Sequence, residues 1–351
     1  MKILVALDGS VHCHAALEAV LKRSWPEGST VKLVTVRQPN ETAFNVLYSE
    51  RKAQTPEDQR NELGLSQRFL LDLKADLSWQ LPGVEIVHEL LIGRAQEVLV
   101  KLAHEWSADL IIMGCQDKKG LDLMLLGSVS QSVLNLAPCP VHIARWGTEE
   151  FGGSGNVTNI LVPMDHSHHS SAALEWLLEQ NFAGPHKFTL ITVVKSINSQ
   201  FANQHSTERA SDLLCAWQTG KDASLCRLKE WGAKLEDKFG KGTASCHVID
   251  GEPATAILSL AANLNAQLIV MGSHGRGRLS RLFIGSVSQA VSIHAPCSVE
   301  IVRGRQSRLH GAISLRASRQ HGSHRDSRFI TCATSTAQVR QSRPPITHAG
   351  L

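Results

Sequence analysis

The segment Leu126-Gly-Ser-Val-Ser-Gln-Ser-Val133 recurs 158 residues later as Ile284-Gly-Ser-Val-Ser-Gln-Ala-Val291, and Ala-Pro-Cys follows soon after both. The same offset, within one residue, aligns Ile3-Leu-Val-Ala-Leu-Asp8 with Ile160-Leu-Val-Pro-Met-Asp165, and Leu110-Ile-Ile-Met-Gly114 with Leu268-Ile-Val-Met-Gly272. A solenoid would repeat every ~20–50 residues. The pattern therefore predicts duplication of a whole domain.

Within each copy, short apolar runs rich in Val, Ile and Leu alternate with longer amphipathic stretches. This alternation is typical of a parallel sheet covered by helices on both faces. We expect an α/β fold, with two tandem, doubly wound, five-stranded parallel-sheet domains of Rossmann-like type. The expected strands lie near 2–7, 30–36, 84–91, 109–114 and 140–145, and near 159–164, 187–194, 244–250, 267–272 and 298–302. The expected helices of the first copy lie near 13–23, 57–79, 94–106 and 128–136.

Composition sets the expected boundaries. The first domain, copy one, covers 1–146, and the second, copy two, covers 157–303. The glycine-rich segment 147–156 is read as a linker. Residues 304–351 lose the apolar periodicity, and we expect a disordered basic tail there.

Charge and cysteine usage narrow the function classes. The tail carries eight arginines and one aspartate, or +7, which leaves −3 of the formal net charge of +4 for residues 1–303. The folded part is therefore not expected to bind nucleic acid. The eight cysteines form no CxxC pair, and no apolar run approaches the ~18 residues of a membrane span. We expect a reduced, cytoplasmic protein without membrane association.

The chemistry is expected in one segment of copy two. Gly272 ends a buried strand and opens a glycine-containing loop, in which backbone N–H groups can approach an anion. Gly285 and Ser286 then open the last helix, where unpaired N–H groups favour phosphate. Both features belong at the carboxyl end of the fourth strand, where ligands of doubly wound sheets bind.

The spacing G-x2-G-x9-G-S, met by Gly272, Gly275, Gly285 and Ser286, resembles the ATP-binding signature of the universal stress protein family. The resemblance covers nearly all of residues 1–303. It implies ATP as the ligand, with or without Mg²⁺, and a nucleotide-dependent regulatory role in stress responses.

The resemblance also implies the remaining site residues. The adenine contact falls on Val193 and the ribose contact on Asp165, while Pro163 and Met271 line the base and sugar pocket; Val287 completes the helix start. The alternative for Asp165 is a cap on the following helix, and that for Val193 is a plain core residue.

Copy one keeps the frame with Gly114, Gly127 and Ser128, but Asp117 replaces the second glycine. Aspartate lacks glycine's freedom at positive φ and would place a carboxylate against a polyphosphate. Arg37 also stands where copy two has the hydrophobic Val194. We interpret copy one as a degenerate partner that keeps the fold, and expect one ATP per chain.

Other chemistry finds little support. The sequence lacks a P-loop, a nucleophile elbow and a zinc-protease helix, and its glycine pattern does not fit NAD binding. The cluster Asp165-His166-Ser-His168-His169 is read as a polar turn, because side chains so close in sequence point apart, and no metal site is expected. Cys139 and Cys297 are read as core thiols.

We do not expect an enzyme. The alternatives are a slow ATP hydrolase, in which His274 or Asp165 orients water, and a scaffold that binds no nucleotide. The fifth strand of each copy should be a sheet edge, so pairing of His142–Arg145 with Val299–Val302 would join the copies as an intrachain pseudo-dimer. Association of two chains into a homodimer stays open.

Overall fold

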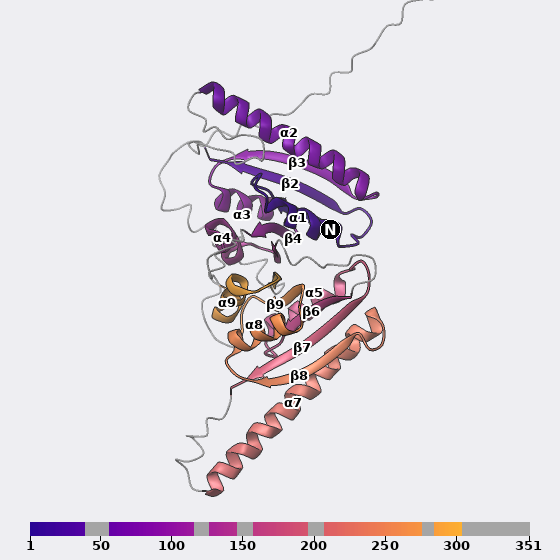
Figure 1. Cartoon of the computed structure of the whole chain (residues 1–351), viewed down its shortest axis with the longest axis vertical. Helices are drawn as coiled ribbons and strands as arrows, with labels where there is room; N and C mark the ends of the chain where they lie inside the picture. The colour runs from indigo at the N-terminus through magenta and orange to yellow at the C-terminus, as the bar shows by residue number, and fades with distance from the viewer. Residues whose placement is uncertain (39–55, 116–125, 146–156, 196–206, 276–283, 304–351) are drawn as a thin grey trace, which may run out of the picture. The chain divides into compact units, whose positions relative to one another are not determined.

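The computed structural model describes residues 1–38, 56–115, 126–145, 157–195, 207–275 and 284–303 (Figure 1). The predicted linker 147–156, the predicted tail 304–351 and Asp117 lie outside the described residues. Within the described ranges, no helix is both long enough and apolar enough to cross a membrane.

Each copy contains five described strands close to the predicted positions. Those of copy one are β1 Lys2–Ala6, β2 Thr30–Arg37, β3 Glu85–Ile92, β4 Leu110–Cys115 and β5 Val141–Arg145. Those of copy two are β6 Thr158–Pro163, β7 His186–Val194, β8 Ala244–Asp250, β9 Leu268–Gly272 and β10 Ser298–Val302. The central strands β5, β9 and β10 are buried along their whole length, which the continuous apolar run of β9 predicts for that strand.

Helices follow the strands in both copies. Copy one has α1 Cys13–Leu21, α2 Pro56–Gln80, α3 Ala95–Glu105 and α4 Ser128–Leu136. Copy two has α5 His168–Glu179, α7 Thr207–Phe239, α8 Pro253–Asn263 and α9 Ser286–His294. Local sequence explains several boundaries: for example, α8 starts with Pro253 and is capped by the Glu252 side chain, which accepts the Thr255 N–H at 3.2 Å.

The described strands form one ten-stranded sheet in the order β3-β2-β1-β4-β5-β10-β9-β6-β7-β8. All pairs within each copy are parallel, which confirms the predicted doubly wound fold. The chain winds outward in opposite directions from β6, toward β7 and toward β9. The carboxyl ends of β6 and β9 therefore flank a topological switch point, the usual ligand position in such sheets.

One hydrophobic core covers each face of the sheet, and each core contains residues of both copies. One includes Leu4 and Val133 of copy one together with Leu161 and Val291 of copy two. The other combines residues such as Leu33 with Phe188, Leu174 and Leu228. Because both cores run across the junction between the copies, the duplicated domains share their apolar packing.

The copies meet where β5 and β10 pair in antiparallel fashion, which confirms the predicted pairing of the two fifth strands. Glu300 lies opposite His142 and is equivalent to it in the duplication. The register is therefore symmetric about this pair, and a pseudo-twofold axis passes between the two residues. We call this junction the seam.

A buried ionic cluster occupies the seam. His142 Nδ1 lies 2.9 Å from Glu300 Oε2 and 3.2 Å from Arg23 Nη2, and Arg23 also forms an ion pair with Glu300. Trp176 Nε1 donates to the other carboxylate oxygen. Burial alone would raise the pKa of Glu300, but Arg23 and His142 hold it well below its usual value. Burial also lowers the pKa of His142.

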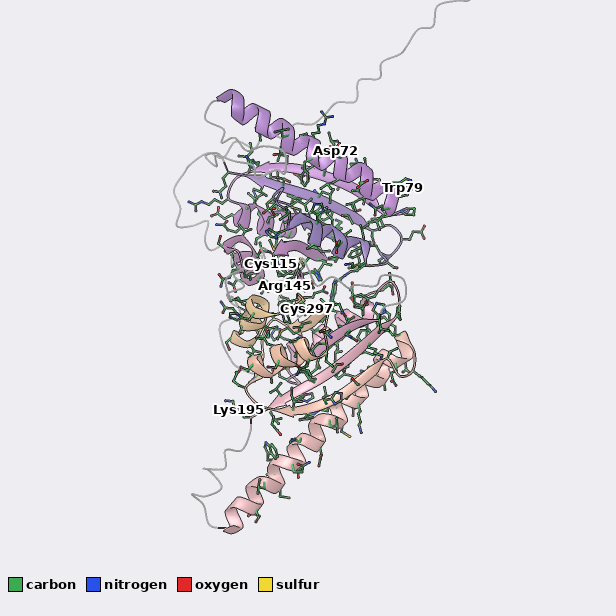
Figure 2. The ribbon with its side chains drawn as sticks, in the orientation of Figure 1. Asp72, Trp79, Cys115, Arg145, Lys195 and Cys297 are labelled. Carbon is green, nitrogen blue, oxygen red and sulfur yellow. The ribbon has the colours of Figure 1, made fainter. Side chains whose placement is uncertain are left out.

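Two arginines reach across the seam in a reciprocal arrangement. Arg145, labelled in Figure 2, is the last residue of β5 and donates through Nη2 to the carbonyl oxygens of Ser292 (2.6 Å) and Ile293 (3.2 Å) at the end of α9. Arg303 follows β10 and donates to the carbonyl oxygens of Leu134 and Asn135 at the end of α4. Each guanidinium thus satisfies the last carbonyls of the opposite copy's helix, where positive charge is favourable.

Candidate nucleotide site

The predicted site residues of copy two come from the carboxyl ends of β6, β7 and β9. Pro163 ends β6, Val193 is the next-to-last residue of β7, and Met271 and Gly272 end β9. Pro163 and Met271 are buried, whereas Val193 is half-buried and packs against a core cluster. The alternative interpretation of Val193 as a core residue therefore holds for the part of its side chain that packs against this cluster.

Asp165 lies two residues after β6 and is oriented by the chain that follows it. Its Oδ1 atom accepts the N–H of Ser167 at 3.0 Å. Ser167 caps α5 by accepting the Ser170 N–H at 3.2 Å, and its hydroxyl reaches the carbonyl of His274 at 3.5 Å. The alternative interpretation of Asp165 as the helix cap is therefore wrong, because Ser167 is the N-cap residue and Asp165 instead accepts the Ser167 N–H in an Asx turn. The carboxylate is left facing the loop after β9.

Gly275, in the described part of this loop, lies beside the carboxylate. A Cβ atom at position 275 would lie 2.8 Å from Asp165 Oδ2, which is shorter than any ordinary contact. An aspartate there would also set two carboxylates against each other, at a cost that grows as the site is desolvated. A side chain at position 275 would therefore force the Asp165 carboxylate to move, and a negatively charged one would also repel it.

Gly272 also has a packing role. A Cβ atom there would lie 2.6 Å from both the carbonyl carbon and the carbonyl oxygen of His169, in the first turn of α5. In copy one, the equivalent Gly114 would collide in the same way with the His12 carbonyl oxygen at 2.2 Å. This glycine lets a strand and a helix approach closely in both copies, which explains why copy one keeps it.

The start of α9 completes the candidate site. Gly285 is its N-cap residue, and no described side chain caps this helix. The Gly285 N–H donates to the Ser273 carbonyl at 2.7 Å, which joins the helix start to the loop after β9. Ser288, one turn further, donates its hydroxyl to the Gly272 carbonyl at 2.8 Å. Gly285 thus brings the helix start, with Ser286 exposed and Val287 half-buried, beside the loop.

The histidines near Asp165 point in different directions, as expected. His166 has a positive φ of 61°, and its Nε2 lies 3.2 Å from Thr192 Oγ1. The ring of His169 instead lies against that of His274, with centroids 5.1 Å apart. Among the described residues, no group of His, Cys, Asp or Glu is arranged to hold a metal ion.

The His169–His274 contact gave no signal in the sequence, because it joins a helix start to a loop over a hundred residues away. Burial lowers the pKa of His169, and the two neighbouring histidines lower it further. The Asp165 charge opposes this shift. The site therefore favours a neutral imidazole at position 169, whose Nδ1 atom has no hydrogen-bond partner among the described residues.

The corresponding region of copy one is arranged differently. Asp8 accepts the Ser10 N–H at 2.9 Å, as Asp165 does from Ser167, but it also accepts from the Cys13 thiol at 3.2 Å. Burial and the Asp8 charge raise the pKa of Cys13 to about 12, so this thiol stays protonated. Arg37 is buried at the end of β2. The Asp8 carboxylate of copy one is therefore engaged by Cys13, the first residue of the helix that follows it.

Cys139 and Cys297, the two cysteines that precede the fifth strands, are buried, as expected for core thiols. Burial raises the pKa of Cys297 to about 12, although the nearby Arg145 charge opposes the shift. A thiol with so high a pKa is a poor nucleophile at neutral pH.

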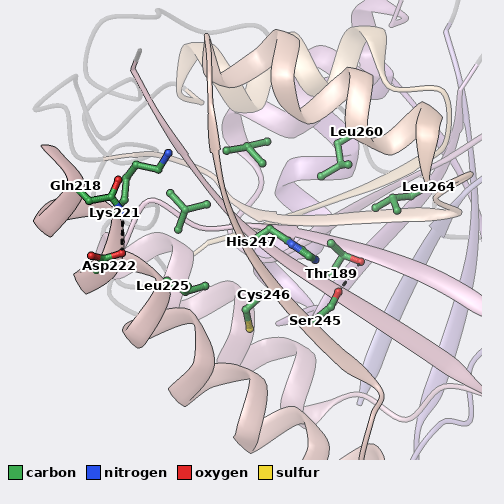
Figure 3. A pocket seen from close by; sticks show the side chains of 12 residues that line it. Thr189, Gln218, Lys221, Asp222, Leu225, Ser245, Cys246, His247, Leu260 and Leu264 are labelled. Carbon is green, nitrogen blue, oxygen red and sulfur yellow. Dashed lines mark hydrogen bonds between the residues drawn. The ribbon is translucent and has the colours of Figure 1, made fainter. Parts of the chain in front are cut away.

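An open cavity of about 570 Å³ lies away from these residues, along the edge strand β8 (Figure 3). Its lining includes Lys221, which forms an ion pair with Asp250 at 3.0 Å, and Gln218, which donates to Asp222 at 3.1 Å. None of the predicted nucleotide residues lines it. Within the lining, the Ser245 hydroxyl also donates to Thr189 Oγ1 at 3.3 Å.

Known proteins resemble this chain along most of its length. A universal stress protein of Mycobacterium tuberculosis is 27% identical over 231 residues, which is 64% of this chain and 70% of that protein. One from Mycolicibacterium smegmatis is 23% identical over 313 residues, covering 86% of this chain and 97% of the relative. The crystal structure of a universal stress protein from Archaeoglobus fulgidus matches with a TM-score of 0.60 at 20% identity, covering 87% of this chain and 98% of that one.

The family model provides the decisive comparison. The model of the universal stress protein family matches twice, over residues 1–145 and 156–303, which together make up most of the chain. The two matches coincide with the two five-stranded copies found in the fold. The chain therefore belongs to the universal stress protein family and contains two of its domains in tandem.

Proposed function

We propose that copy two binds one ATP molecule, with or without Mg²⁺, and that occupancy makes the tandem unit a regulatory module in a stress response. The observation that carries this proposal is the uncapped start of α9, tied to the loop after β9 through the Gly285 N–H, with the Asp165 carboxylate beside Gly275. Unpaired N–H groups and the helix dipole favour phosphate there, and a carboxylate suits ribose hydroxyls.

The regulatory part of the proposal follows from linkage. A ligand shifts a conformational equilibrium only by its differential affinity for the two states. The proposal places the protein in the cytoplasm, where ATP is abundant and where free thiols such as those of Cys13 and Cys297 stay reduced. Copy one acts in this scheme as a partner that binds no nucleotide.

Calorimetric titration with ATP tests the assignment. The expected result is one site per chain for the unaltered protein and binding weakened more than tenfold by Gly275→Asp. Two like charges ~4 Å apart cost about 4 kcal/mol at an effective dielectric constant of 20, and even half of this exceeds the tenfold step of about 1.4 kcal/mol.

A matched control is offered by Gly220 in α7, where an added Cβ meets nothing within 4 Å. Gly220→Asp adds the same charge to copy two away from the site and should leave ATP affinity within about twofold. Two equivalent sites in the unaltered chain, or unchanged affinity in Gly275→Asp, would refute the assignment.

The alternatives of a slow ATP hydrolase and a nucleotide-free scaffold are separated by one further measurement. The protein is purified without added nucleotide and denatured, and the released nucleotide is identified. Intact ATP supports the binding module, ADP that accumulates on incubation supports the hydrolase, and the absence of nucleotide supports the scaffold.

A further inference from the structure

We propose that Asn135 of copy one is a positioning residue for the phosphate-binding turn of copy two, so that the ATP affinity of copy two depends on its degenerate partner. The inference rests on the proposed function. It assigns a role to copy one that goes beyond keeping the fold.

The contact that carries the inference crosses the seam. The backbone N–H of Ile284 donates to Asn135 Oδ1 at 3.2 Å. Ile284 is buried and directly precedes Gly285, the N-cap residue of α9. The peptide that leads into the proposed phosphate site is thus held by a side chain of the other copy.

Asn135 is itself fixed in place. It lies in the last turn of α4, and its carbonyl oxygen accepts from Arg303 Nη2 at 2.7 Å. Arg303 follows β10 of copy two and is buried. Copy two therefore donates a hydrogen bond to the backbone carbonyl of Asn135, while the Asn135 side chain accepts one from the backbone of copy two.

The duplication shows that this contact is an exception to the reciprocity of the seam. Arg145 and Arg303 make equivalent contacts in both directions. The residue equivalent to Asn135 is Ile293, and the one equivalent to Ile284 is Leu126. An isoleucine side chain has no acceptor, so it cannot hold the Leu126 N–H in this way.

The acceptor is therefore present only on the side that supports the intact loop. In the sequence of copy one, the reciprocal residue Leu126 precedes Gly127 of the signature in which Asp117 replaces the second glycine. This match between the asymmetric contact and the asymmetric signature indicates that Asn135 serves the site rather than the seam in general.

The physical effect is preorganisation. With the Ile284 N–H paired, the following Gly285 N–H is directed to the Ser273 carbonyl, at 2.7 Å. The next amides, those of Ser286 and Val287, belong to the first turn of α9, which has no side-chain cap from its N-cap residue. Binding ATP no longer has to order this turn, so affinity rises without any new contact to the ligand.

The test uses the full chain with Asn135→Leu, which removes the acceptor at similar size, and Leu136→Ala as a matched control. Leu136 lies in the same last turn of α4 and is 54% exposed. Loss of one neutral hydrogen bond predicts ATP binding weakened by about fivefold in Asn135→Leu. Adenosine lacks phosphates, so its affinity should stay within about twofold in both variants.

Amide hydrogen exchange without nucleotide gives a second reading that does not depend on ATP. Exchange at Ile284 should accelerate in Asn135→Leu and stay within about twofold in Asn135→Asp, because a carboxylate still accepts the N–H. The Leu136→Ala variant should exchange like the unaltered chain.

Equal weakening of ATP and adenosine binding in Asn135→Leu would show general damage to copy two and overturn the inference. Unchanged ATP affinity with unchanged exchange would also overturn it, and would leave the proposed function standing. Failure of the unaltered chain to bind ATP would instead refute the proposed function, and the role of Asn135 in affinity with it.

Discussion

Replacing Glu300 by glutamine should destabilise the protein more than any surface charge change, because it leaves Arg23 charged and unpaired inside the seam. Glu300 is 1% exposed and Arg23 is 5% exposed. Breaking a buried ion pair on one side typically costs 3–5 kcal/mol, because the remaining charge stays desolvated. Glutamine keeps nearly the same shape and can still accept the Trp176 N–H. The loss of stability in Glu300→Gln therefore measures the effect of removing the Glu300 charge.

The expected size of the effect can be converted to a melting shift. Unfolding entropy is about 2.1 cal/mol/K per residue, or about 0.6 kcal/mol/K for about 300 cooperatively folded residues. A loss of about 4 kcal/mol thus lowers the melting temperature by about 6 °C. Urea titration gives the same quantity from the transition midpoint at constant slope.

Two companion variants make this prediction specific. Glu89→Gln breaks the partly exposed pair with Lys32, whose side chains are 33% and 16% exposed, and should cost less than about 1 kcal/mol. Arg23→Met combined with Glu300→Gln removes the unpaired charge and should be more stable than Glu300→Gln alone. A midpoint for Glu300→Gln no lower than that for Glu89→Gln would refute the reasoning.

Three further predictions concern the same fold. The unfolding free energy should fall as the pH drops below about 6.5, because the pKa of His142 is lowered in the folded protein and the unfolded chain therefore binds a proton at this histidine first. In urea titrations at several pH values, His142→Gln should reduce this dependence of the unfolding free energy on pH. An unchanged pH dependence would contradict the assignment. Gly272→Ala and Gly114→Ala should each lower the unfolding free energy by about 1–3 kcal/mol, since both Cβ atoms would meet helix backbone; stability near the unaltered value would show that the helices yield. Arg145→Met and Arg303→Met should each cost about 1.5–3 kcal/mol by calorimetry, and a loss below 0.5 kcal/mol would deny their role at the helix ends.

Much of this architecture is predictable from the sequence, because duplication and apolar periodicity are local signals that repeat. The run Leu268–Gly272 is apolar at every position before its glycine, and it forms a fully buried strand as expected. Pairing of the fifth strands is predictable for another reason, since each is expected at a sheet edge whose backbone N–H and C=O groups would otherwise stay unpaired.

The candidate site is predictable only in part. The signature glycines can be found by spacing, yet the sequence does not show that Gly272 packs against a helix while Gly275 meets a carboxylate. Such roles depend on which backbone lies opposite. The Asn135–Ile284 hydrogen bond joins residues 149 positions apart. A single polar pair of this kind leaves no periodic trace, so only the folded structure reveals it.

The pairing of Glu300 with His142 at the pseudo-twofold axis makes each copy a poor partner for itself. A free copy two that dimerised through β10 would bury Glu300 against its own counterpart, and a free copy one would oppose two His142 rings whose burial disfavours charge. The unlike pair satisfies both residues. If the two copies are produced as separate polypeptides, each should therefore bind the other copy in preference to a second molecule of itself. The specificity of this heterodimer would come from the His142–Glu300 pair on the pseudo-twofold axis.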